Sequence, residues 1–188
     1  MQLYTIIGGV NGVGKSSFTG SLKSQSTQLG TIIDVDKITN NIGGDAIKGA
    51  KIATEKIDEC LQNGYSFTQE TTLSGNKTAR TCKKAKENNY TIHLFYIGLD
   101  TEEESFKRIE NRVQKGGHSI PKETVHKRFE TRFEALKKVL PYCDEAMFFD
   151  NNNGFLQVAE YRNGELIITV KEPPLWLRQM ASEIGQQL

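Results

Sequence analysis

Short apolar runs alternate with longer amphipathic stretches through the first 150 residues of the chain. The runs are rich in Ile, Val, Phe and Tyr, which favour strands, and one of them is apolar almost throughout, as buried parallel strands are. We expect strands at residues 3–9, 30–36, 64–71, 90–100 and 145–150.

The stretches between these runs have helical periodicity. They begin near Asp45, Lys77, Thr101 and Pro121. The acidic residues after Thr101 and the proline at 121 are both typical of the first turn of a helix. The residues expected to face the sheet are Ala46, Ala50, Ala53, Ile57 and Leu61, then Ala79, Cys82 and Ala85, then Phe106, Ile109 and Val113, and finally Val125, Phe129, Leu136 and Leu140.

Strand–helix alternation of this kind predicts right-handed βαβ units, and therefore an α/β fold with a parallel sheet flanked by helices. The pattern changes after residue 150. Two strand-like runs, at about 155–171, surround Asn163-Gly164, a strong hairpin signal, so we expect an antiparallel addition at the sheet edge. A final helix begins near Leu175. No linker or repeat divides the chain, and we expect one domain over residues 1–188.

Composition narrows the classes of protein. With 188 residues, 37% hydrophobic and 25% charged, the chain has the make-up of a globular domain. A net charge of +1 gives no electrostatic reason to expect nucleic acid or a membrane as partner, and no apolar run reaches transmembrane length. Cys60, Cys82 and Cys143 lack C-x-x-C spacing, so we expect reduced thiols in a cytoplasmic protein without a signal peptide.

Residues 8–17, GGVNGVGKSS, contain the P-loop pattern G-x-x-x-x-G-K-[ST] between a predicted strand and a segment that can open a helix. Glycines let the backbone curl so that its N–H groups point into one concavity, and a helix N-terminus favours an anion. The pattern predicts that Lys15 reaches the β- and γ-phosphates of ATP and that Ser16 joins the Mg²⁺ shell. The residues expected to contact the nucleotide are Gly9, Asn11, Gly12, Val13, Gly14, Lys15, Ser16 and Ser17.

Acidic residues follow the second and third predicted strands, at the sheet edge where ligands collect in α/β folds. Alternation puts Asp34 and Asp36 on the same side of the second strand, with Asp36 further out. Asp36 is a candidate general base, and a helix N-cap is the alternative role. Glu70 and Thr71, at the end of the third strand, are candidates for binding acceptor hydroxyls or Mg²⁺-bound water.

A cation-rich segment over about residues 108–132 surrounds Gly116-Gly117. It predicts a lid that closes over the triphosphate, in which Arg112, His118 and Arg128 offset transition-state charge. A solvated helix pair is the alternative. Its arginines form two pairs one helical turn apart: Arg108 with Arg112 and Arg128 with Arg132.

Among P-loop proteins, a small-molecule kinase fits best. The chain lacks the N-K-x-D element of GTPases and is short for a motor ATPase. The alternative is an ATP-binding switch that hydrolyses ATP slowly and acts through a protein partner. Release of ADP that depends on a particular acceptor would distinguish the kinase from the switch.

Five stretches in this order resemble the zeta-toxin-like P-loop kinases, in particular their short stand-alone bacterial branch: GGVNGVGKSS, DVDKI, QETTLSG, RVQKGGHSIP and DNN. The resemblance extends from about Leu3 to Asn152 and implies a phosphotransferase that uses ATP and Mg²⁺. Characterised members phosphorylate the 3′-hydroxyl of the sugar in UDP-N-acetylglucosamine. A nucleotide sugar is therefore a candidate acceptor, and an antitoxin protein is a candidate partner.

The resemblance also implies roles for single residues. The base aspartate of the family matches Asp36, its substrate-binding glutamate matches Glu70, and His118 is a further candidate substrate contact. The chain departs from the family where Ser74 and Gly75 stand in place of an arginine, and where one lid arginine is replaced near His118. These departures leave the triphosphate chemistry intact and bear on the identity of the acceptor.

Overall fold

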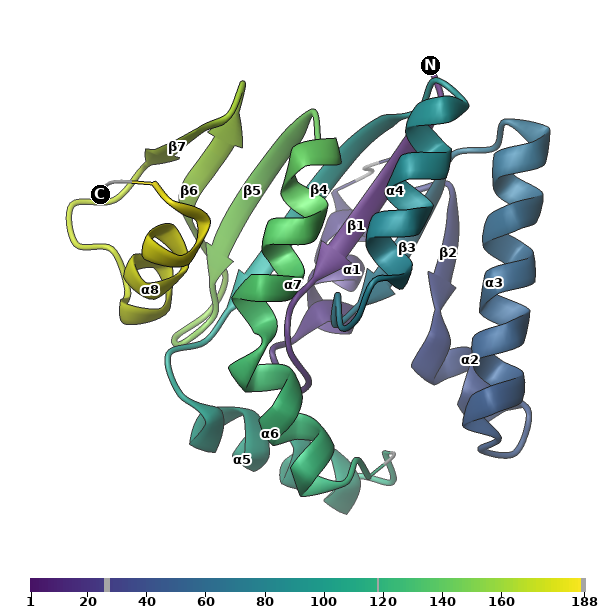
Figure 1. Cartoon of the computed structure of the whole chain (residues 1–188). Helices are drawn as coiled ribbons and strands as arrows, with labels where there is room; N and C mark the ends of the chain where they lie inside the picture. Colours follow the sequence, from purple (N-terminus) through teal and green to yellow (C-terminus); the bar gives the residue numbers. More distant parts are fainter. Residues whose placement is uncertain (26–27, 118, 187–188) are drawn as a thin grey trace.

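The computed structural model describes residues 1–25, 28–117 and 119–186. Its centre is one seven-stranded sheet in the order β2-β3-β1-β4-β5-β6-β7 (Figure 1). The first five strands are parallel, and the last two add to β5 as an antiparallel pair. The strands are β1 (Leu3–Gly8), β2 (Thr31–Asp34), β3 (Phe67–Thr71), β4 (Thr91–Gly98), β5 (Glu145–Asp150), β6 (Leu156–Arg162) and β7 (Glu165–Ile168).

This architecture confirms the expected α/β fold, the parallel sheet and the C-terminal hairpin. Asn163 and Gly164 both have positive φ, as a two-residue type I′ turn requires, and they join β6 to β7. The helices are α1 (Lys15–Ser24), α2 (Val35–Asn41), α3 (Ala46–Asn63), α4 (Lys77–Glu87), α5 (Glu102–Gln114), α6 (Lys122–Glu130), α7 (Arg132–Val139) and α8 (Leu175–Ile184).

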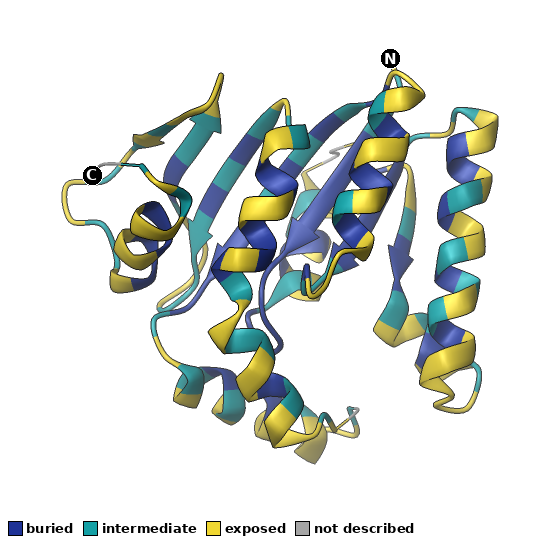
Figure 2. Ribbon diagram, viewed as in Figure 1, coloured by how far each residue is buried: buried dark blue, intermediate teal, exposed yellow. Residues whose placement is uncertain are grey.

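Side chains on the two faces of the sheet form two apolar cores. Tyr4 and Ile6 of β1 face a large core shared with α3, α4, α7 and α8, whereas Ile7 faces a smaller core with Phe18 of α1. The buried residues form stripes along the strands and along the inward sides of these helices (Figure 2). The alternation of β1 between the two cores fixes its register, because a one-residue slip would exchange them.

The structure corrects three details of the predicted helices. Ala46, expected to face the sheet, is exposed at the first position of α3. The helix beginning at Pro121 divides at Thr131 into α6 and α7. Val113 of α5 was expected in the core but is 38% exposed, because α5 and α6 lie beyond the ends of the strands rather than on the sheet (Figure 1). Only Ser105 and Ile109 of α5 are buried. These two helices instead form one side of the surface at the carboxyl ends of the strands.

The C-terminal helix α8 is fixed to the sheet at the same end. Its Trp176 is fully buried, and its ring lies where a Cβ atom at Gly98 would be, so only glycine fits there. The Trp176 indole N–H donates to Asp150 (2.8 Å), and its backbone N–H donates to Asp100 (2.9 Å). Among the described residues, no helix is both long and apolar enough to span a bilayer.

Candidate active site

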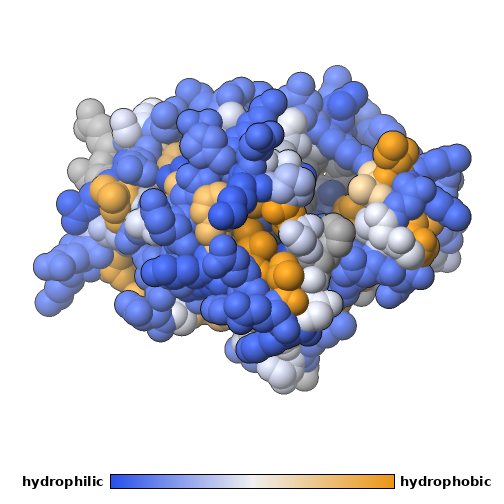
Figure 3. Space-filling view, turned by 90° about the horizontal axis from the view of Figure 1, so that it is seen from below, coloured by the Kyte–Doolittle hydropathy of each residue, from blue (hydrophilic) through white to orange (hydrophobic). Residues whose placement is uncertain are grey.

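A cleft of about 860 Å³ lies at the carboxyl ends of the parallel strands. Figure 3 views the molecule from this end and shows a hollow in the surface. The cleft brings together most of the residues that the sequence marks as functional: Asn11, Gly12, Gly14, Lys15, Ser16, Ser17, Asp36, Glu70, Thr71, Arg112 and Arg128. Gly9 and Val13 are buried in the loop and do not line the cleft, and His118 lies outside the described residues.

The glycines of the loop between β1 and α1 have no room for side chains. Gly9, Gly12 and Gly14 all have φ values between 74° and 141°, which favour glycine. A Cβ atom at Gly12 would lie 2.6 Å from the Ser105 carbonyl oxygen, and one at Gly14 would lie 2.7 Å from Asn151 Nδ2. The loop is therefore held against α5 and against the segment after β5.

Lys15 bends back over this loop. Its Nζ donates to the carbonyl oxygens of Gly9 and Val10, each at 3.0 Å. Burial lowers the pKa of Lys15 from 10.5 to about 8, against the opposing effect of Asp36, then Glu70, then Asp34. Arg128 lowers this pKa further. The ammonium group is thus partly desolvated among three carboxylates and one guanidinium, and a triphosphate would favour its charged form.

This pKa predicts that ATP binding takes up a proton above pH 8. Lys15 is then neutral in the free protein, and the anionic triphosphate raises its pKa and restores its charge, so the affinity for ATP falls as pH rises through 8. We expect Kd to weaken towards tenfold per pH unit between pH 8 and 9.5. Calorimetry in buffers of different ionisation enthalpy measures the uptake directly. Binding without proton uptake in this range would contradict the assignment of Lys15 to the phosphates.

Glu70 binds the hydroxyls that follow the loop. The side chain of Glu70 is buried, and its two oxygens accept hydrogen bonds from Ser16 Oγ (2.7 Å) and Thr19 Oγ1 (2.6 Å). The sequence gives Glu70 two candidate roles, a contact to acceptor hydroxyls or to Mg²⁺-bound water, and the structure places its carboxylate on the Ser16 hydroxyl, which is expected to bind Mg²⁺. A hydroxyl beside a carboxylate is a set of hard oxygen donors, which suits Mg²⁺. The residues therefore fit this cation.

Asp34 and Asp36 have different environments. Asp34 ends β2 and caps α2, since its Oδ1 accepts from the Lys37 backbone N–H (3.1 Å) and its Oδ2 lies 3.4 Å from Lys37 Nζ. Asp36 lies in the first turn of α2, is exposed, and lines the cleft. The expectation that both lie on one side of a strand is wrong, because the chain turns into a helix at Val35. Asp34, rather than Asp36, is the helix N-cap.

The segment expected to form a lid lies along the other side of the cleft. Arg112 of α5 lines the cleft, and Arg128 of α6 donates to Asn11 Oδ1 (2.9 Å) in the loop. Gly116 and Gly117 end α5 in a Schellman motif, with Gly116 at a positive φ of 85°. The Gly116 N–H donates a hydrogen bond to the Val113 carbonyl oxygen, and the Gly117 N–H donates one to the Arg112 carbonyl oxygen (2.9 Å). In the structure, these two glycines therefore end a helix beside the cleft.

The other two arginines of the segment have different positions. Arg132 packs its guanidinium on Phe129 (3.8 Å to the ring centroid) and Phe133 (4.2 Å) and does not line the cleft. Arg108 does line it, and its Nη2 donates to the Asn151 carbonyl oxygen at 2.6 Å. The sequence spacing does not show which of the four arginines line the cleft, because the two arginines of each pair are the same distance apart.

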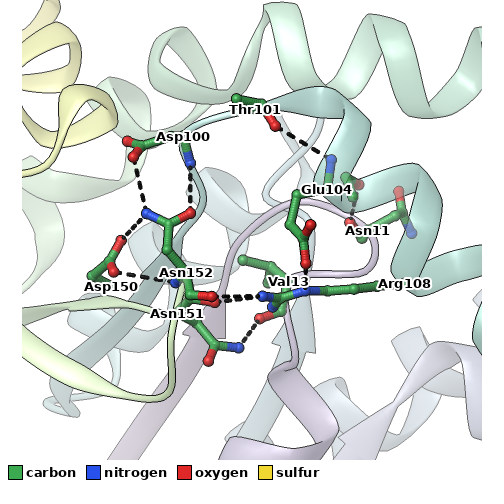
Figure 4. A network of polar contacts seen from close by, with 10 residues as sticks. Asn11, Val13, Asp100, Thr101, Glu104, Arg108, Asp150, Asn151 and Asn152 are labelled. Atoms are coloured by element: carbon green, nitrogen blue, oxygen red, sulfur yellow. Dashed lines mark hydrogen bonds and ion pairs between the residues drawn. The ribbon is translucent and has the colours of Figure 1, made fainter.

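A polar network that was not predicted from the sequence joins the P-loop to the segment after β5 (Figure 4). Asn151 Nδ2 donates to the Val13 carbonyl oxygen (2.8 Å), so the segment after β5 holds the P-loop. The adjacent Asn152 donates to Asp100 (3.0 Å) and Asp150 (2.8 Å), the two residues that also bind Trp176. Consecutive asparagines directly after a predicted strand were the available signal for this network.

The sequence matches a known family. The zeta toxin family profile matches residues 46–155. An uncharacterized protein of Haemophilus influenzae (strain ATCC 51907 / DSM 11121 / KW20 / Rd) is 35% identical over 127 residues, which cover 64% of this chain and 88% of that protein. The family match includes β3, the expected lid and the asparagines after β5.

Solved structures share the fold. A crystal structure of AvrRxo1-ORF1:-ORF2 with ATP superposes with a TM-score of 0.71 at 15% identity, covering 100% of this chain and 65% of that one. This chain therefore spans slightly less than two thirds of that neighbour's length. A structure from the PezAT chromosomal toxin-antitoxin system of Streptococcus pneumoniae superposes with a TM-score of 0.59 at 16% identity, covering 83% of this chain and 71% of that one.

Proposed function

This chain belongs to the zeta toxin family, and on that premise we propose that it transfers the γ-phosphoryl group of ATP to a hydroxyl of a small acceptor. The observation that carries the proposal is the position of Asp36. It places a carboxylate with no capping role in the same cleft as Lys15 and Ser16 of the P-loop. A base beside a triphosphate site is what phosphoryl transfer to a hydroxyl requires.

The P-loop binds the triphosphate in this proposal. Its backbone N–H groups contact the phosphates, and Lys15 exchanges the carbonyl oxygens of Gly9 and Val10 for the β- and γ-phosphates. Ser16 would hold Mg²⁺, with Glu70 orienting the Ser16 hydroxyl. The bound cation supplies charge neutralisation at the phosphates. Fixing Glu70 with a second hydroxyl, that of Thr19, keeps this arrangement rigid.

Asp36 acts as the general base. It accepts the proton of the acceptor hydroxyl while that oxygen forms a bond to the γ-phosphorus, and the bond from the γ-phosphorus to the bridging oxygen breaks to release ADP. Arg112 and Arg128 stabilise the negative charge that spreads over the transferred group. Thr71, at the end of β3, lines the cleft and is the candidate contact to the acceptor in this proposal.

A nucleotide sugar such as UDP-N-acetylglucosamine is the first acceptor to test, because the family resemblance points to it. An antitoxin is a candidate protein partner, since a fold neighbour comes from a toxin-antitoxin system. ATP as the donor is supported by the P-loop and by the fold neighbour whose crystal structure was solved with ATP.

Acceptor-dependent release of ADP tests the proposal. The purified chain is incubated with Mg-ATP and single nucleotide sugars, and ADP is measured with and without each one. A kinase releases ADP at a rate that depends on one acceptor. A slow rate that no small molecule changes, but that a protein partner stimulates, would favour the ATP-binding switch instead.

Closure of the lid gives a further prediction. If α5 and α6 close over bound nucleotide, amide exchange over residues 108–132 should slow when a non-hydrolysable ATP analogue and Mg²⁺ are added. Peptides from β6 and β7, which do not line the cleft, serve as the internal control. If exchange over residues 108–132 stayed unchanged while nucleotide binding was shown independently, the segment would not be a lid but a solvated helix pair.

A further inference from the structure

Positive charge is concentrated on two neighbouring helices. In a chain with 24 cationic and 23 acidic residues, α4 and α7 together carry eight of the first kind and two of the second. The two helices contact each other and lie side by side on one face of the sheet (Figure 1). The net charge of +1 therefore does not reveal a cationic surface on this face.

A groove of about 290 Å³ lies between these helices. It is lined by Asn76, Ala79, Arg80, Lys83, Lys138 and Tyr142. None of these six residues lines the cleft. The side chains of Ala79 and Tyr142 are half-buried and pack on the large core, whereas the lysines and the arginine are exposed. The groove thus has an apolar floor and a cationic rim.

Two of the rim cations are not balanced by an opposite charge. Among the described residues, no carboxylate oxygen lies within 4.0 Å of the charged groups of Arg80 and Lys83. Arg80 donates to the Asn76 carbonyl oxygen of its own helix (3.4 Å). The third cation, Lys138, pairs with Glu134 at 2.7 Å. Arg80 and Lys83 are therefore available to an anionic partner.

The surroundings of the groove favour a protein as this partner. A phosphate backbone laid along the two helices would meet the carboxylates of Glu134 and Asp144, which pair with lysines of these helices. Among the described residues, the large exposed apolar side chains all lie outside α4, α7 and the turn after α7, so this face lacks anchors for a bilayer. A protein segment can combine carboxylates for the rim with apolar side chains for the floor.

We propose that the groove between α4 and α7 binds an acidic, amphipathic segment of a partner protein. Arg80 and Lys83 pair with its carboxylates, and Ala79 and Tyr142 contact its apolar side chains. An amphipathic helix in a groove is a common mode of peptide recognition. The inference does not rest on the proposed phosphotransferase, because the groove and the cleft share no lining residue.

A matched pair of peptides tests the chemistry of the groove. The first is a short peptide of leucine, alanine and glutamate with the leucines at helical spacing, and the second has glutamine in place of every glutamate. Each is titrated into isotopically labelled protein whose cleft is filled with Mg²⁺ and a non-hydrolysable ATP analogue, so that the P-loop cannot take up the anionic peptide. We expect the acidic peptide to shift the amide NMR signals of residues 76–83 and 138–142, and the glutamine peptide to leave them unchanged.

Two adjacent lysines assign the effect to the groove. Lys83 lines the groove, whereas Lys84 Nζ pairs with Asp58 of α3 at 3.0 Å on the other side of α4. At physiological ionic strength, Lys83→Gln should weaken binding of the acidic peptide about threefold, as the loss of one exposed ion pair does. Adding Arg80→Gln should bring the loss to about tenfold. Lys84→Gln makes the same change in net charge and should bind the peptide as wild type does.

Three results would each overturn the proposal: equal binding of the two peptides, equal weakening by Lys83→Gln and Lys84→Gln, or shifts confined to residues outside the groove. A single-stranded RNA oligonucleotide and vesicles containing phosphatidylserine are titrated in the same way. If either bound this groove more tightly than the acidic peptide, the groove would not be a surface for protein docking.

Discussion

Lys15→Met is expected to abolish Mg-ATP turnover and to weaken ATP binding strongly. The side chain is the cation that the P-loop brings to the β- and γ-phosphates, and removing one preorganised group of this kind costs on the order of 10²–10³ in rate or more. Methionine keeps the length and the apolar stem of lysine. The measurements are ADP release and calorimetric binding of an ATP analogue.

The same substitution should not destabilise the unliganded protein. Folding lowers the pKa of Lys15 from 10.5 to about 8, so the folded chain binds fewer protons than the unfolded chain between these values. The buried side chain therefore does not lower the free energy of unfolding above pH 10.5. As pH falls from 10.5 to 8, it lowers that free energy by about 1.4 kcal/mol per unit of the pKa shift. At pH 7 wild type carries this cost and the methionine variant does not.

We expect the Tm of unliganded Lys15→Met at pH 7 to equal or exceed that of wild type, because the lost hydrogen bonds to Gly9 and Val10 offset only part of the gain. A large fall in Tm would show that Lys15 is a structural residue. Normal ATP turnover by the variant would show that the glycine-rich loop does not bind the triphosphate.

Asp36→Asn should reduce phosphoryl transfer on the order of 10²–10⁴ while ATP still binds. Asparagine keeps the shape of the side chain and its hydrogen-bonding capacity but cannot take the acceptor proton. Because Asp36 is exposed and does not cap α2, the substitution should leave the fold unchanged. The rate of transfer and the Kd for an ATP analogue are the two measurements.

Asp34→Asn is the matched control, two residues away. Asp34 caps α2 through the Lys37 N–H, and asparagine caps helices about as well as aspartate. We therefore expect Asp34→Asn to retain transfer. If Asp34→Asn stopped transfer and Asp36→Asn did not, the roles of the two carboxylates would have to be exchanged.

Much of the fold was predictable because its strongest determinants are local. The strand at residues 145–150 has the predicted bounds, since a short apolar run followed by polar residues marks both ends. The Asn163-Gly164 turn was predictable because few other dipeptides adopt positive φ at both positions. The P-loop combines a local motif with the right neighbouring elements, and most of its expected contact residues line the cleft.

The division of roles within the site was not predictable, because it depends on where elements distant in sequence meet. Asp34 caps a seven-residue helix, Val35–Asn41, and Asp36 lies in its first turn. Helices this short leave little periodicity to detect. The contact of Glu70 with Ser16 spans 54 positions, and that of Asn151 with Val13 spans 138.

The fate of the γ-phosphoryl group is the most direct test of the proposed phosphotransferase. Wild type and Asp36→Asn are each incubated with γ-labelled ATP, Mg²⁺ and a panel of nucleotide sugars and sugar phosphates, and the labelled products are separated. The proposed function predicts label in an organic product with wild type and its near absence with Asp36→Asn. Label recovered only as inorganic phosphate, at the same rate from both proteins, would contradict it.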